Sequence, residues 1–167
     1  MGSALTLTPQ EYLATSFSGP DREYVRGEVI ERNVGEKNHA IAQWRLAGLI
    51  FELARRKAVV GCTELRLQLK PDTFRIPDVC IYTDEPAERV PTRPPLVVVE
   101  IVSPDDRYSE LIQKLDEYEA WGVPRIWLID PSLKTLTIYR DGTLQRVDQL
   151  ALAELDFSLS PQDLFPE

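Results

Sequence analysis

Histidine, cysteine and long hydrophobic runs are scarce in this sequence. One histidine and two cysteines, Cys62 and Cys80, are too few for a structural zinc site or a disulfide framework. We therefore expect both cysteines to be reduced core thiols. No apolar run approaches the roughly 20 residues of a membrane-spanning helix, and no secretion signal opens the chain. These absences predict a soluble, cytoplasmic protein.

Charge of one sign prevails. Lys and Arg number 19, Asp and Glu number 27, and the net charge is −8. Because an acidic protein repels a polyanion, a nucleic-acid ligand would need a local basic surface or a bound metal. The 167 residues, 43% of them hydrophobic, predict one globular domain, which we assign to residues 4–167.

The first half of the chain carries clear signals of secondary structure. Thr8-Pro9-Gln10-Glu11 predicts a capping box and a helix that ends near residues 18–20. Residues 22–33 alternate around Arg26-Gly27 as a β-hairpin would. A helix is expected from Asn38 to about Lys57, and strands at 63–69, 75–82 and 96–102.

The second half continues the alternation of helix and strand. A helix is predicted over 108–121, ended by Gly122 and Pro124, and a buried strand over 125–129. Residues 135–140 and 144–148 should form a hairpin with a type I′ turn at Asp141-Gly142, and the tail from Ala151 a short helix or loop. This order predicts a mixed α/β sheet in which strands 96–102 and 125–129 are parallel.

Two carboxylates lie within these apolar strands. Alternation places Glu100 in the inward row of strand 96–102, where an unpaired ionised carboxylate would cost several kcal/mol. Asp78 is similarly surrounded by apolar residues in strand 75–82. If the two strands pair antiparallel, the acids lie side by side and could bind Mg²⁺ or Mn²⁺. Alternatively, each acid pairs separately with an arginine such as Arg75.

A lysine accompanies them. At 100° per residue, Lys114 falls within the buried stripe of helix 108–121, whereas Asp116 and Glu117 fall on the other side. Lys114 either extends to the edge of that stripe or reaches the two carboxylates. Two acids and a lysine around a metal are the groups that phosphodiester hydrolysis requires.

These residues resemble the PD-(D/E)XK nuclease superfamily. Pro77-Asp78 is similar to its PD element, and Glu100-Ile101-Val102 is similar to its (D/E)XK element, with valine where lysine would stand. The sequence resembles in more detail the Uma family of restriction-endonuclease-like proteins within it. That resemblance is carried by Arg75-Ile76-Pro77-Asp78-Val79, by Val98 to Pro104, by Lys114 with Tyr118, and by Gly122 to Pro131.

The resemblance implies a fold and a site. The fold would be α/β, with a restriction-endonuclease-like mixed β-sheet core (α-β-β-β-α-β) and added N-terminal and C-terminal hairpins. Asp78, Glu100 and the carbonyl of Ile101 would hold the metal, and Lys114 would be the catalytic lysine, moved from the strand to the helix. Glu28 either completes the site or is an exposed hairpin acid. His39 is either structural or catalytic.

We therefore expect a Mg²⁺-dependent (or Mn²⁺-dependent) endonuclease that hydrolyses DNA and, by analogy, could form a homodimer. One alternative is a catalytically weak nuclease-fold module that binds nucleic acid or serves as an accessory. Another is an acidic interaction protein whose cluster is a structural ion-pair network. Metal binding distinguishes the first hypothesis from the last, and turnover distinguishes the first from the second.

Overall fold

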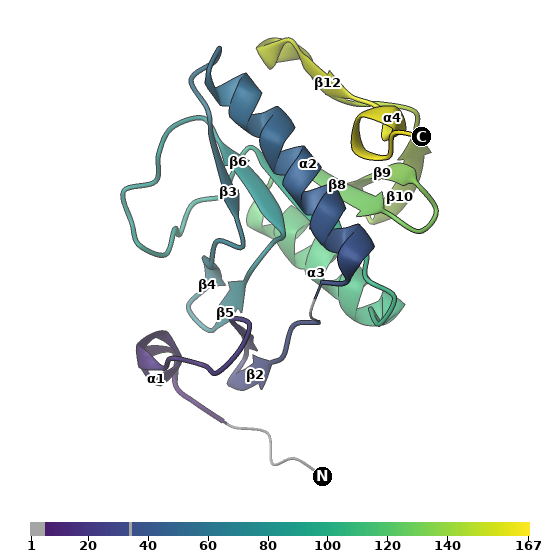
Figure 1. Ribbon diagram of the computed structural model, residues 1–167. Helices are drawn as coiled ribbons and strands as arrows, with labels where there is room; N and C mark the ends of the chain where they lie inside the picture. The colour runs from purple at the N-terminus through teal and green to yellow at the C-terminus, as the bar shows by residue number, and fades with distance from the viewer. Residues whose placement is uncertain (1–5, 34) are drawn as a thin grey trace.

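The computed structural model describes residues 6–33 and 35–167. These residues form layers of helix and sheet. Figure 1 shows α2 lying across one side of the central sheet and α3 behind it. None of the helices in these two ranges is long and apolar enough to cross a membrane. The elements are α1 (Pro9–Ala14), β1 (Glu23–Val25), β2 (Glu28–Ile30), α2 (Lys37–Ala54), β3 (Val60–Thr63), β4 (Leu67–Lys70), β5 (Thr73–Arg75), β6 (Val79–Tyr82), β7 (Val97–Ile101), α3 (Tyr108–Trp121), β8 (Arg125–Asp130), β9 (Thr135–Arg140), β10 (Thr143–Val147), β11 (Leu150–Leu152), η1 (Ala153–Leu155), β12 (Phe157–Leu159) and α4 (Pro161–Leu164).

The largest sheet has six strands in the order β10-β9-β8-β7-β6-β3. Strands β7 and β8 are parallel, as predicted for a strand, helix, strand unit, and the other neighbours are antiparallel. All residues of β7 are buried because the sheet is covered on both faces. Elements α2, β3, β6, β7, α3 and β8 supply the expected α-β-β-β-α-β order.

A second sheet, in the order β2-β1-β5-β4, takes part of the chain away from the first. The predictions of single strands at 63–69 and 75–82 are therefore wrong, because each range is divided between the two sheets. Pro77 has no N–H to donate to a sheet, and Glu64 has a left-handed φ of 52°. These two positions are the corners at which the chain passes between sheets.

Helix ends and turns agree with the sequence only in part. The Thr8 and Glu11 capping box is present, but α1 ends at Ala14 rather than near residue 18. Helix α2 begins earlier than predicted, at Lys37, after Glu36. The hairpin turn at Asp141-Gly142 has positive φ at both residues, as a type I′ turn requires.

The C-terminal tail is more regular than predicted. It forms a two-stranded sheet of β11 and β12, followed by α4, instead of only a helix or loop. Its apolar side chains belong to the same core as α2. This long-range packing, absent from any local pattern, stabilises the two short strands.

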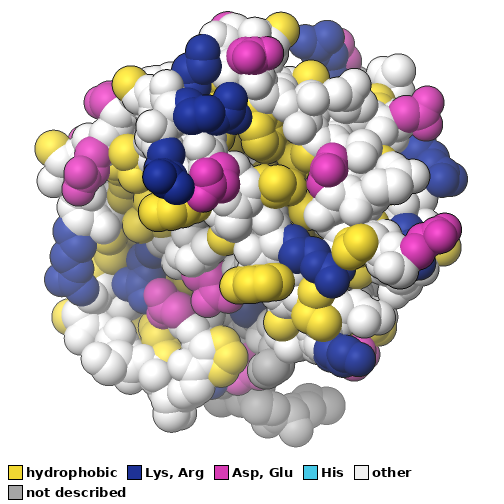
Figure 2. All heavy atoms as spheres, turned by 45° about the horizontal axis from the view of Figure 1, so that its top comes forward, with side chains coloured by type: hydrophobic (Ala, Val, Ile, Leu, Met, Phe, Trp, Pro, Cys, Tyr) yellow, Lys and Arg dark blue, Asp and Glu magenta, His cyan; other side chains and the backbone are white. Residues whose placement is uncertain are grey.

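The surface carries exposed hydrophobic side chains among mixed charges. The large hydrophobic residues that are most exposed are Trp44, Phe51, Tyr108 and Leu133. On the face drawn in Figure 2, Lys and Arg side chains are interspersed with Asp and Glu rather than gathered into one broad basic surface. This face therefore offers no extended electrostatic footprint for a nucleic acid.

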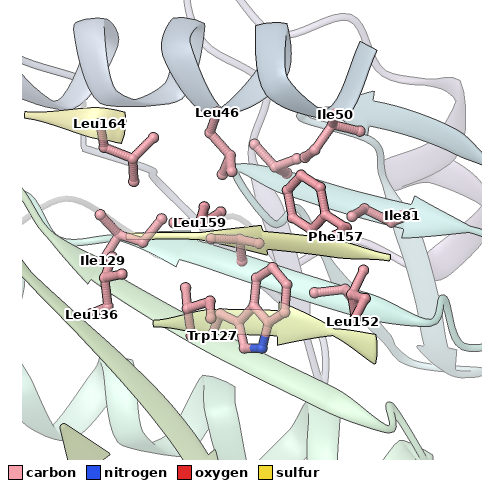
Figure 3. Packing of buried hydrophobic residues seen from close by; sticks show 14 of the residues in the cluster. Leu46, Ile50, Ile81, Trp127, Ile129, Leu136, Leu152, Phe157, Leu159 and Leu164 are labelled. Carbon is pink, nitrogen blue, oxygen red and sulfur yellow. The ribbon is translucent and has the colours of Figure 1, made fainter. Parts of the chain in front are cut away.

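Two apolar clusters lie on opposite faces of the six-stranded sheet. Figure 3 shows Leu46 and Ile50 of α2 above Trp127, with Phe157 and Leu164 of the tail beside them. On the other face, α3 packs on the side-chain row that contains Cys80, Val98 and Ile126. Glu100 follows Val98 in that row by alternation, so its carboxylate is turned toward α3.

Candidate active site

Asp78 and Glu100 meet where β6 begins and β7 ends. The antiparallel register pairs Val79 with Val99, and one further step places Asp78 opposite Glu100. The antiparallel pairing on which the side-by-side placement of the two acids depended is thus present. Both acidic residues are only 5% exposed. Two carboxylates so nearly buried need donors or cations around them.

Asp78 is fixed by one backbone donor and faces two basic side chains. Its Oδ2 accepts a 2.7 Å hydrogen bond from the N–H of Ile101, and its Oδ1 lies 3.4 Å from the guanidinium of Arg32. The Nε2 atom of His39 lies 3.3 Å from the same Oδ1. Burial opposes the charged form of His39, but the hydrogen bond and negative charge of Asp78 outweigh it and raise the pKa of the imidazole.

Lys114 extends from α3 toward Asp78 and Glu100, and these three side chains are called the cluster below. Its Nζ lies 2.9 Å from Oε1 of Glu100, 2.8 Å from Oε1 of Glu23, and 3.2 Å from the carbonyl oxygen of Ile76. Burial opposes the charge on this ammonium, but the carboxylates of Glu100 and Glu23 outweigh burial and raise the pKa of Lys114. The lysine therefore does not extend to solvent at the edge of the helix; three acceptors match its three N–H donors.

Glu100 has one oxygen engaged and one without a bonded side chain. Its Oε1 pairs with Lys114 and accepts a 2.8 Å hydrogen bond from the hydroxyl of Tyr118. Among the described residues, none forms a hydrogen bond or ion pair with Oε2. Burial raises the pKa of Glu100 to about 7; Lys114 acts against this rise, while Asp78 and Glu23 add to it.

Glu23 is a buried neighbour of the cluster that sequence reasoning missed. It lies on β1, is 4% exposed, and accepts hydrogen bonds from the N–H of Ile76 and from Arg75 as well as pairing with Lys114. Burial raises its pKa, but Lys114 and Arg75 prevail and lower it below the usual value. Glu23 thus gives Lys114 a second carboxylate partner besides Glu100.

Arg75 does not neutralise the two acids considered in the sequence. Its guanidinium lies 2.9 Å from Glu23 and 2.6 Å from Glu117. Glu117 was expected on the face of α3 away from the buried stripe, but its side chain turns back to meet Arg75. Asp78 instead faces His39 and Arg32, and Glu100 pairs with Lys114.

Glu28 lies near the cluster without joining it. It begins β2, is exposed, and lines the same cavity as Asp78 and Glu100. Within residues 6–33 and 35–167, no hydrogen bond or ion pair connects its side chain to Asp78, Glu100 or Lys114. Of the acids on this hairpin, Glu23 contacts the lysine.

The cluster forms the wall of an open cavity of about 550 Å³. Acidic and basic side chains both line it, and Arg32, Arg107 and Lys114 are among its cations. A volume of this size is typical of ligand sites. A phosphate group could therefore enter beside the two carboxylates and meet positive charge.

The oxygen atoms of this site suit a small divalent cation. Asp78 and Glu100 provide carboxylates, and the backbone carbonyl of Ile101 follows Glu100 directly. The described parts of the chain contain no group of three or more His, Cys, Asp or Glu side chains placed to hold a metal. Two carboxylates with water and a substrate phosphate completing the shell are the usual ligands of Mg²⁺, so the donor set fits that ion.

Comparisons with known proteins agree with this architecture. A solved structure described as a putative nuclease belonging to DUF820 from Anabaena variabilis ATCC 29413 superposes with a TM-score of 0.82 at 22% identity, covering 95% of this chain and 97% of that one. This likeness shows the fold. No curated protein matches the sequence. The model of the Uma2 family, described as "Putative restriction endonuclease", matches residues 9–167, and the chain therefore belongs to that family.

Proposed function

We propose that this protein is a Mg²⁺- or Mn²⁺-dependent endonuclease that hydrolyses phosphodiester bonds of DNA in the cavity formed by Asp78, Glu100 and Lys114. The observation that carries the proposal is the buried ammonium of Lys114, 2.9 Å from Glu100, in the same cavity as Asp78. Membership of a family of restriction-endonuclease-like proteins supports nuclease activity in general.

Asp78, Glu100 and the carbonyl of Ile101 would hold the metal. When bound, the metal would polarise the scissile phosphate and lower the pKa of a water molecule. The N–H of Ile101 keeps the Asp78 carboxylate in a fixed orientation through its 2.7 Å hydrogen bond. Tyr118 does the same for Glu100, whose Oε2 remains available to a ligand.

Lys114 would stabilise the negative charge that develops on the phosphate. Its raised pKa keeps the proton on Nζ at neutral pH, so it can donate to an anionic oxygen. The bond to the carbonyl of Ile76 is the longest of its three contacts, at 3.2 Å. A phosphate oxygen would most readily replace that neutral acceptor, while Glu23 and Glu100 keep the ammonium in place.

Arg32 and Arg107 would bind the DNA backbone at the mouth of the cavity. Both line it, and Arg32 already faces Asp78. With a net charge of −8, the protein gains little from general attraction to DNA, so these local cations and the metal would have to supply it. Binding should consequently be weak in the absence of a divalent ion.

A second candidate function is a nuclease-fold module that binds nucleic acid but cleaves it poorly. The observation in its favour is that all three donors of Lys114 are already engaged by protein acceptors. A lysine held in this way must give up a bond before it contacts substrate, which would slow the reaction. Turnover separates this candidate from the first.

The test is a cleavage assay with supercoiled, linear and single-stranded DNA in Mg²⁺, Mn²⁺ or chelator. We expect metal-dependent cleavage by the wild type, and its loss in Asp78→Asn purified in the same way, which controls for contaminating nucleases. Conversion of supercoiled plasmid directly to linear DNA would support a homodimer that cuts both strands, whereas nicking indicates one site acting alone. DNA binding without any cleavage would favour the second candidate.

A further inference from the structure

The two cysteines lie directly opposite each other on adjacent antiparallel strands. The register of β3 and β6 pairs Cys62 with Cys80. In the same ladder the N–H of Glu64 donates to the carbonyl of Asp78 at 3.2 Å, which identifies that pair as hydrogen-bonded. Because such pairs alternate along the ladder, Cys62 and Cys80, two residues further on, form a pair of the same type.

This pairing permits a strained, readily reduced disulfide bond. The Cα atoms of a hydrogen-bonded antiparallel pair are about 5.5 Å apart, within the roughly 4.4–6.8 Å that protein disulfides span. Directly opposed side chains also point to the same face of a sheet. Both cysteines accordingly contact the apolar cluster beneath α3. The Cβ atoms of such a pair, about 5.5 Å apart, must approach to roughly 3.5–4.5 Å, so the bond strains the two strands and is easily reduced.

The two thiols differ in accessibility. Cys62 is half-buried and lies on β3, the outermost strand of the sheet, whereas Cys80 is fully buried on β6. An accessible thiol beside a protected one is the arrangement of an attacking and a resolving cysteine.

We propose that Cys62 and Cys80 are a redox-modification site at which hydrogen peroxide converts the two thiols into an intrachain disulfide. The Cys62 thiolate attacks one peroxide oxygen: an S–O bond forms, the O–O bond breaks, and the departing hydroxide leaves as water after taking a proton. Cys80 then attacks the sulfur of the Cys62 sulfenic acid: the S–S bond forms, the S–O bond breaks, and hydroxide leaves with the Cys80 proton as water. Two thiols thus lose two electrons to one peroxide, and a dithiol reductant reverses the change.

The disulfide would join β3, at the edge of the six-stranded sheet, to β6, which begins next to the proposed metal ligand Asp78. Cys80 follows Asp78 by two residues, and the segment between the cysteines contains β4 and β5. Closing this segment restricts the unfolded chain, and the strain in the bond acts against that gain in stability. The site does not depend on the nuclease hypothesis.

The experiment treats the folded protein with limiting hydrogen peroxide, blocks remaining thiols, digests without reduction, and identifies peptides by mass spectrometry. Trypsin should release the peptide 58–66 linked to the peptide 76–89, and dithiothreitol should separate them. The thiol count should fall from two to zero per chain.

Two single variants provide matched controls. In Cys80→Ser, Cys62 should accumulate as a sulfenic acid that dimedone traps; in Cys62→Ser, the buried Cys80 should resist the same dose of peroxide. The proposal is overturned if the wild type forms only disulfides between chains or sulfinic acid, or if the linked peptides appear only after unfolding in urea.

Discussion

Replacement of Lys114 by methionine separates a catalytic cluster from a structural one. Lys114→Met keeps most of the apolar stem but removes the charge that pairs with Glu23 and Glu100. If that charge stabilises the developing charge on phosphate, single-turnover cleavage should slow by about 10²-fold or more, the typical effect of losing one preorganised electrostatic donor. A purely structural lysine predicts a loss of stability with cleavage unchanged.

The structure also sets the expected loss of stability. Breaking a buried ion pair commonly costs about 3–5 kcal/mol because an uncompensated charge remains. Here Glu23 keeps Arg75 and the N–H of Ile76, and Glu100, with a pKa of about 7, can take up a proton. We therefore expect a smaller loss of about 2 kcal/mol, or a decrease in melting temperature of roughly 4–8 °C for a chain of this size.

A matched control removes a different cation, one that lies between β3 and β4 and pairs with the N-terminal segment. Arg66 is 15% exposed in its side chain and pairs with Asp21 at 2.6 Å, and it does not line the cavity of the cluster. Arg66→Met should lower the melting temperature while cleavage by the folded protein stays near the wild-type rate. Measured below both melting temperatures, near-wild-type cleavage by Lys114→Met would refute its catalytic role and leave a structural ion-pair network.

The remaining predictions concern metal, the neighbouring acid and salt. Mg²⁺ or Mn²⁺ should raise the melting temperature of the wild type by mass action but not that of Asp78→Asn, and an equal rise in both would contradict a site at Asp78. Glu23→Gln keeps an oxygen for the N–H of Ile76 but loses the charge beside Lys114, so cleavage should fall by about tenfold, less than in Lys114→Met. A loss as large as that of Lys114→Met would mean that Glu23 does more than position the lysine. DNA affinity should be low in chelator and fall steeply with added monovalent salt, which a fluorescence-anisotropy titration measures; tight, salt-insensitive binding would count against the charge argument.

Local patterns made the acids and the lysine candidate neighbours. Alternation assigned Glu100 to an inward row, and helical periodicity assigned Lys114 to the buried stripe of the helix that follows. A short connection from strand to helix to parallel strand packs that stripe back over the same row. Asp78 completed the group because consecutive strands usually pair, and β6 does pair with β7.

Glu23 and Arg75 could not be found in the same way. They meet because β1 pairs with β5, a contact between segments some fifty residues apart. Each strand has three residues, too few for alternation to show which side chains face inward. The nearby Glu28 was singled out by its resemblance to a hairpin acid, whereas burial distinguishes Glu23.

The two-sheet arrangement was missed for a related reason. The sequence indicated where extended chain occurs at 63–69 and 75–82, but not that Glu64 and Pro77 redirect it to another sheet. A turn residue marks a break, whereas the partner of each segment depends on packing elsewhere in the chain. Strands β11 and β12 of the tail likewise depend on contacts with the core formed by α2.

The central claim is that Asp78 and Glu100 form a divalent-metal site, and anomalous diffraction from crystals soaked in Mn²⁺ tests it most directly. We predict one strong anomalous peak per chain, at coordination distance from both carboxylates and from the carbonyl oxygen of Ile101. A peak elsewhere, or no peak at a Mn²⁺ concentration that supports DNA cleavage, would contradict the claim.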